Sequence, residues 1–146
     1  MGGCVQPAEV RRRILEEHRK LRVMLDALVP LATRFEHGSS ADGAKLREDA
    51  LALYETFAGH LLHEENTLEP ALRARGAEGE KLAERLAHEH REQRALLTYL
   101  VSRLEDHPGP TLLVAREVRS FAEYLYHDMA HEESTLLSAA VLPDEP

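Results

Sequence analysis

Two six-residue segments of this chain repeat almost letter for letter and combine imidazole with carboxylate side chains. They read HEENTL at residues 63–68 and HEESTL at residues 131–136. Another histidine stands shortly before each segment, His60 before the first and His127 before the second. Imidazole and carboxylate groups together are a donor set that transition-metal ions bind. Two helices that carry such groups and face each other can hold two metal ions.

Four long helical patterns, separated by short clusters of breaker residues, must position these groups. Apolar residues recur along each pattern at intervals of three and four, as they do on one face of an α-helix. Pro30 should kink or shorten the first helix, and Pro70 should bend the last turns of the second. No alternating strand pattern competes, so the sequence predicts an all-α, up-down-up-down four-helix bundle. We expect the helices over residues 7–35, 44–75, 80–106 and 111–141.

Each predicted helix carries titratable residues on or near its apolar stripe, at positions where core residues are expected. Positions three or four apart share one face of a helix. These stripe residues are His18, His60, Glu64, His90, Asp128 and Glu132. A single inward histidine is more often a hydrogen-bonded core residue than a ligand. Ionised carboxylates are costly to bury without a partner, so two or more of them near several imidazoles favour bound divalent cations.

The chain also repeats itself at the level of helix pairs. The tripeptide EHR at residues 17–19 of the first helix recurs at residues 89–91 of the third. The two HEE segments relate the second helix to the fourth in the same way. The chain therefore looks like two copies of a helical hairpin, each with one histidine on its first helix and a His/Glu cluster on its second.

The segment HLLHEE at residues 60–65 resembles the second-helix motif of hemerythrin-like domains in the HHE cation-binding family. The resemblance covers about residues 10–141, and it implies a hemerythrin-like bundle. In that pattern, the histidine at the start of the motif is a terminal metal ligand and the first glutamate is a bridging carboxylate. The five-residue spacing from His127 to Glu132 is similar to the ligand pair on the last helix of hemerythrins. The metal ligands that the resemblance implies are His18, His60, Glu64, His90, His127 and Glu132.

Two positions depart from the hemerythrin pattern or leave it open. Hemerythrins carry a second histidine four residues before the His90 position, where this chain has Leu86. The implied set is therefore four histidines and two glutamates, which leaves open coordination positions on one ion. On the fourth helix, Asp128 or His131 can replace His127 as the ligand, and a π-bulge would change which side chain reaches the site.

The donor set and the resemblance together bear on the metal and on function. Imidazole suits iron and zinc, whereas carboxylates suit harder ions such as iron and manganese. We therefore expect two iron ions, with zinc or manganese as alternatives. The resemblance implies a protein that binds or senses O2 or a related small molecule, or handles iron, with O2, peroxide or NO as its ligand.

Two other function classes remain open. The first is a di-iron enzyme that acts on peroxide or NO in oxidative or nitrosative stress. The chain has no separate catalytic motif, such as a nucleophile elbow, a phosphate-binding loop or a CxxC pair, so enzymatic activity stays undecided. The second is a metal-free helical interaction module, whose stability would not depend on metal.

Length and composition set outer bounds. A chain of 146 residues suits one domain, which we place at residues 10–141 between tails at 1–9 and 142–146. The net charge of -8 argues against a nucleic-acid partner. No apolar run approaches the ~20 residues that span a bilayer. The single cysteine, Cys4, is compatible with a reducing cytoplasm. The abundance of Ala, Arg, Leu and Glu favours a bacterial source, and no pattern indicates the oligomeric state.

Overall fold

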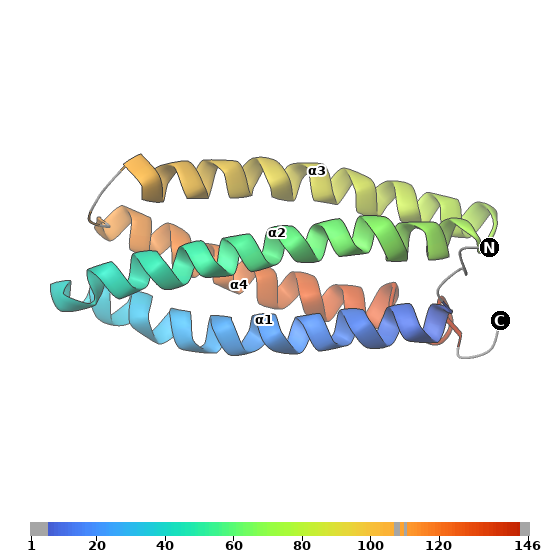
Figure 1. The fold of residues 1–146 in the computed structure, drawn as a ribbon, viewed down its shortest axis with the longest axis horizontal. Helices are drawn as coiled ribbons and strands as arrows, with labels where there is room; N and C mark the ends of the chain where they lie inside the picture. The colour runs from blue at the N-terminus through green and yellow to red at the C-terminus, as the bar shows by residue number, and fades with distance from the viewer. Residues whose placement is uncertain (1–5, 107–108, 110, 144–146) are drawn as a thin grey trace.

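The chain folds into a bundle of antiparallel helices. The computed structural model describes residues 6–106, 109 and 111–143, so Cys4 and most of both predicted tails lie outside the described residues. Successive helices run in opposite directions along one long axis (Figure 1). This arrangement confirms the predicted all-α, up-down-up-down bundle. Its elements are α1 (Pro7–Glu36), the short 3-10 turn η1 (Ser40–Asp42), α2 (Gly43–Arg73), α3 (Ala77–Asp106) and α4 (Leu112–Thr135).

The observed helix boundaries differ from the expected ones mainly at the end of α4. The helix ends at Thr135 rather than near residue 141. At this end, the hydroxyl groups of Ser134 and Thr135 both donate hydrogen bonds to the His131 carbonyl. The following turns bury Leu142, which the sequence assigned to a tail. Pro30 does not shorten α1, because that helix continues to Glu36, one residue beyond its expected end.

The helices do not pack equally closely on one another. α1 packs closely on both α2 and α4, and α2 packs closely on α3, whereas α3 and α4 approach each other at fewer places. The turn from α2 to α3 uses Gly76, whose φ of +88° favours glycine. At the start of α3, Gly79 lies so close to α2 that an added Cβ would come within 1.8 Å of the Leu72 carbonyl oxygen. These two glycines permit the tight α2–α3 hairpin.

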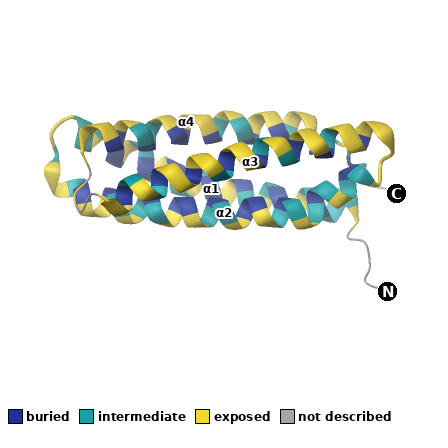
Figure 2. Ribbon diagram, turned by 90° about the horizontal axis from the view of Figure 1, so that it is seen from above, coloured by how far each residue is buried: buried dark blue, intermediate teal, exposed yellow. Residues whose placement is uncertain are grey.

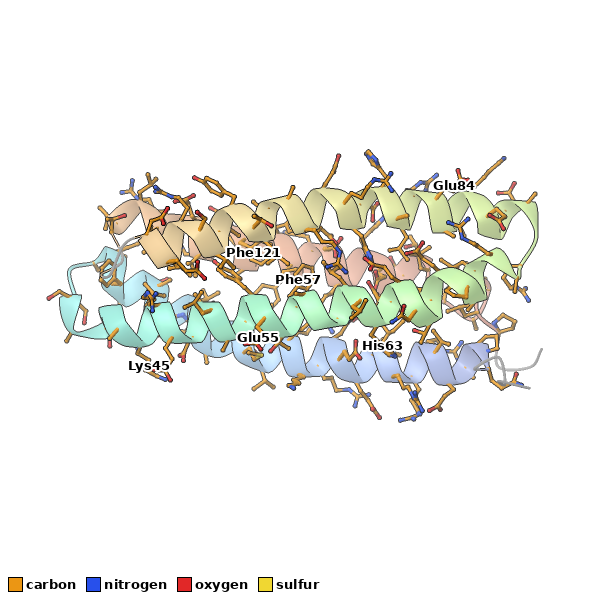
Figure 3. The ribbon with its side chains drawn as sticks, turned by 45° about the horizontal axis from the view of Figure 1, so that its top comes forward. Lys45, Glu55, Phe57, His63, Glu84 and Phe121 are labelled. Carbon is orange, nitrogen blue, oxygen red and sulfur yellow. The ribbon has the colours of Figure 1, made fainter. Side chains whose placement is uncertain are left out.

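Buried residues lie on the inner faces of the helices, and exposed residues lie on the outside of the bundle (Figure 2). The interior contains two separate apolar clusters. The larger cluster includes Phe57 and Phe121, which lie inside the bundle with their ring centroids 5.8 Å apart (Figure 3). The smaller cluster includes Ile14, Leu68 and Leu86. Among the described residues, no helix is both long and apolar enough to cross a membrane.

A layer of buried polar side chains separates the two clusters. On α1, for example, His18 lies between Ile14 of the smaller cluster and Leu21 of the larger one. We call this set the polar layer. Its members are His18, His60, Glu64, His90, Gln93 and Glu132. The fold thus brings titratable groups from α1, α2, α3 and α4 to one level of the bundle.

Candidate metal centre

Four side chains of the polar layer present donor atoms to a common point. One ligand atom from each lies within 4.8 Å of the others, and all four side chains are buried. They come from α1, α2 and α4. The four are His18, His60, Glu64 and Glu132. Two imidazoles and two carboxylates at this separation can hold a metal ion.

Each buried histidine of the polar layer directs its Nδ1 to a carboxylate on a neighbouring helix. The pairs are His18 with Glu133 at 2.7 Å, His60 with Glu17 at 2.6 Å and His90 with Glu65 at 3.0 Å. We call these three glutamates the outer carboxylates. An ionised carboxylate only accepts hydrogen bonds, so each Nδ1 carries a proton, and Nε2 is the ring atom left to bind a metal. Metal-binding histidines in proteins are oriented in this way.

Arginines hold two of the outer carboxylates in their charged form. Arg22 lies 2.8 Å from Glu133, and Arg94 lies 2.8 Å from Glu65. Burial alone would raise the pKa of these acids, but the neighbouring arginine and histidine outweigh it and hold each pKa below its usual value. Glu65 and Glu133 therefore stay ionised at neutral pH and keep His90 and His18 correctly oriented.

The Nε2 atoms of the three histidines face Glu64 and Glu132, which we call the inner glutamates. His90 Nε2 lies 3.0 Å from Glu64 Oε1, and His60 Nε2 lies 3.4 Å from Glu64 Oε2. His18 Nε2 lies 3.1 Å from Glu132 Oε1, but the two atoms are not aligned as a hydrogen bond. Glu64 therefore presents one oxygen to each side of the polar layer, as a bridging carboxylate does.

Three inward atoms of this group have no hydrogen-bond partner among the described residues. They are His18 Nε2, Glu64 Oε2 and Glu132 Oε1. Buried polar atoms in folded proteins are nearly always paired, and leaving one unpaired costs about 1–3 kcal/mol. A metal ion at their common point would satisfy all three. The residues present therefore fit a bound cation.

Protons occupy the polar layer when no cation is bound. Burial and the nearby Glu64 raise the pKa of Glu132 well above its usual value, whereas contacts with histidines and Glu132 hold that of Glu64 well below. Burial lowers the pKa of His60, but Glu64 and Glu17 outweigh it and raise the value to about 9. Burial and His60 together lower the pKa of His18. With a pKa of about 9, His60 carries a proton at neutral pH that a bound cation must displace.

On α4, the structure does not bring His127 to the polar layer. Its side chain is exposed, while the next residue, Asp128, is half-buried. Because α4 is α-helical throughout, five residues turn the chain about 140° away from Glu132, whereas four turn it only about 40°. Asp128 lines a cavity of about 110 Å³ together with Glu132 and Leu86. Burial, Glu64 and Glu89 raise the pKa of Asp128 to about 6.

The other histidines near the site lie outside the polar layer. His63 is half-buried, and its Nδ1 lies 2.6 Å from Glu17, so it helps to hold that outer carboxylate. His131 is exposed and lines the edge of the same 110 Å³ cavity. His88 is exposed and lies 3.1 Å from Glu92, on the outside of α3.

The sequence reasoning missed the outer carboxylates and the arginines that hold them. The missed signal is an extension of the EHR repeat. The pattern EHRxxR occurs at residues 17–22 and again at 89–94, and its last position supplies Arg22 and Arg94. Each arginine lies one helical turn after a buried histidine of the same helix. The histidine and the arginine of each pair therefore contact the same outer carboxylate.

Comparison with known families agrees with this geometry. A family model described as the hemerythrin HHE cation-binding domain matches residues 10–140. Comparisons with curated proteins and with solved structures found no significant match. The match to the family model covers nearly the whole chain and includes every residue of the polar layer. This chain belongs to the hemerythrin HHE cation-binding domain family.

Proposed function

We propose that this protein binds two iron ions in its polar layer and uses them to bind or sense O2 or a related small molecule, or to handle iron. The observation that carries the proposal is the orientation of three buried histidines. Each gives its Nδ1 to an outer carboxylate and turns its Nε2 toward Glu64 or Glu132. This orientation leaves the lone pairs where only a cation or a proton can use them.

The mixture of donors supports iron among the transition metals. Carboxylates favour iron and manganese, and imidazoles favour iron and zinc, so iron suits both kinds of ligand. Bound iron supplies one-electron redox chemistry and open positions for small ligands. Zinc and manganese are the alternatives that the same donors allow.

The chain's own residues restrict which ligand can reach the ions. The cavity beside Glu132 has a volume of about 110 Å³, and Leu82, Leu86 and Leu136 form its apolar part. Pockets for drug-sized ligands are about 300–1,000 Å³. This smaller space suits O2, NO or peroxide better than an organic substrate. The apolar clusters on both sides of the polar layer block the approach of water along the axis of the bundle.

The same cavity supports a second candidate function, the turnover of peroxide or NO by a di-iron enzyme. Reversible binding and turnover differ in a direct assay, because only an enzyme consumes many equivalents of peroxide or NO per chain. We also propose a cytoplasmic location, on the ground that a reducing compartment would keep iron in its ferrous form. A metal-free interaction module would leave the three unpartnered inward atoms without an explanation.

The test is the metal content of the purified protein, measured together with its absorption spectrum before and after anaerobic reconstitution with ferrous iron. We expect about two irons per chain, as in di-iron carboxylate bundles. A His18→Ala variant should lose iron, whereas the control His88→Ala should not, because His88 is exposed on α3. Less than one metal ion per chain after reconstitution would refute the proposal.

A further inference from the structure

The internal repeat relates the two halves of the polar layer, but it changes one residue. HLLHEE at residues 60–65 aligns with DMAHEE at residues 128–133, which puts Asp128 in the place of His60. Each of these residues stands four positions before a buried glutamate, Glu64 or Glu132, and therefore on nearly the same helix face. The halves thus have the same framework but a different donor at one position.

The first half gathers two imidazoles. The rings of His18 and His60 lie 5.1 Å apart, and both belong to the four-donor group with Glu64 and Glu132. Both rings are also held by outer carboxylates at 2.7 Å or less. An ion at this point would find two oriented nitrogens and two oxygens already in place.

The second half contributes one buried imidazole to the polar layer, that of His90. His90 Nε2 faces Glu64, but the residue one turn earlier on α3 is the buried Leu86. One turn later, the Gln93 amide donates a hydrogen bond to the Tyr124 hydroxyl. The remaining donor that α4 directs toward this half is the half-buried carboxylate of Asp128.

The repeat also changes the role of the glutamate next to the histidine. Glu17 accepts a hydrogen bond from His60 Nδ1, which orients that ring. Its counterpart in the repeat, Glu89, lines the cavity beside Asp128, whose carboxylate has no ring N–H to donate. The second half is therefore richer in oxygen and negative charge, and it lacks one of the contacts that orient donors in the first.

We propose that the polar layer forms two unequal metal sites: a nitrogen-rich, high-affinity site of His18, His60, Glu64 and Glu132, and an oxygen-rich, weaker site of His90 and Asp128 that shares the two glutamates. This inference rests on the metal binding proposed above. In the described part of the chain, the four donors of the first site lie within 4.8 Å of one another, and Asp128 and His90 are not part of that group. The donors of the second site must rearrange to meet an ion, and that rearrangement lowers the affinity.

Solvent access does not distinguish the two sites. A surface hollow of about 360 Å³ borders His60 next to Gly59, and the 110 Å³ cavity borders Asp128 on the other side. Both ions would therefore have a route to solvent. The difference in affinity must come from the ligands, which makes the ligands the right target for a test.

The experiment is a titration of the metal-free protein with Co²⁺, followed by calorimetry and by the visible absorption of bound cobalt. We expect two binding steps, with the second at least about tenfold weaker in affinity. Tenfold is the lower end of the loss of metal affinity that follows from changing one partner of a metal ligand. Asp128→His supplies the imidazole that the repeat places in the first half, so it should tighten the second step. Asp128→Asn keeps the shape of the side chain and should weaken that step. Thermal melts would establish that each variant folds.

His127→Ala is the matched control, because His127 is exposed and adjacent to Asp128. It should leave both steps unchanged. Loss of the second step in His127→Ala, or two equal steps in the native protein, would overturn the unequal sites while leaving metal binding intact. An Asp128→His variant that folds and binds cobalt as the native protein does would also overturn them. Absence of any cobalt binding to the native protein would refute the proposed function as well.

Discussion

Replacing one outer carboxylate should weaken metal binding without unfolding the protein. In the native protein, His18 Nδ1 donates a 2.7 Å hydrogen bond to Glu133. In Glu133→Gln, the amide oxygen can still accept this bond, but the negative charge is lost. That charge makes the ring a stronger donor to a metal. Removing such partners typically lowers metal affinity by about 10–100-fold.

The structure places Glu133→Gln at the lower end of that range. The Glu133 side chain is 26% exposed, so water partly screens its charge, and the substituted amide preserves the orientation of the ring. We therefore expect about a tenfold loss of affinity, which corresponds to about 1.4 kcal/mol. The ion pair with Arg22 is also partly exposed and contributes at most about 1 kcal/mol to folding stability.

The assay is competition for Co²⁺ between the protein and a coloured chelator, with melting temperatures of the metal-free proteins measured in parallel. Glu16→Gln is the matched control, since it removes the same charge from a side chain that is 52% exposed and pairs with Arg12. The control should bind cobalt as the native protein does. Equal affinities for Glu133→Gln and Glu16→Gln would refute the idea that the outer carboxylates tune the metal ligands.

Three further predictions concern stability. Removing the metal with a chelator should lower the melting temperature, because an ion present at 100 times its Kd stabilises the fold by about 2.7 kcal/mol. In the metal-free protein, the pKa of His60 is raised from 6.5 to about 9, so its stabilising proton is fully present below pH 6.5 and is lost as pH rises through 9. The melting temperature of the metal-free protein should therefore fall between pH 6.5 and 9. It should fall less over the same range in His60→Gln. Gly79→Ala should destabilise the fold, because the new Cβ meets the Leu72 carbonyl oxygen at 1.8 Å, whereas Gly59→Ala meets nothing within 4 Å and should stabilise α2 by up to about 1 kcal/mol in a denaturant titration.

Local periodicity was sufficient to predict the fold, but not where α4 ends. Long amphipathic stripes determine which face of each helix is buried, and short breaker clusters determine where most helices stop. The end of α4 depends instead on tertiary contacts. Leu137 and Leu142 pack with Val10 and Leu72 of other helices, and no local pattern in the sequence encodes that pairing.

The inner residues of the site were predictable for the same reason, and the outer ones were not. His18 and Glu64 stand in place of core residues on apolar stripes, so their burial follows from spacing alone. Glu65 and Glu133 lie one position away from the stripe, where charged residues are usually solvated. Their role depends on which histidine of a neighbouring helix lies opposite, and this becomes clear only when the helices are placed side by side.

The choice between His127 and Asp128 shows how helix geometry can decide where resemblance alone does not. A five-residue spacing suits two ligands only if the helix is locally underwound, as in a π-bulge, and the described α4 is a regular α-helix. The internal repeat independently aligns Asp128, not His127, with His60. The helix geometry and the repeat therefore favour the same residue. A carboxylate at this position adds negative charge beside Glu132, which two divalent ions would neutralise and which protons must neutralise in their absence. The asymmetry of the two halves would thus come from the proposed ligand set itself, and the order of metal binding is the most direct test of that proposal.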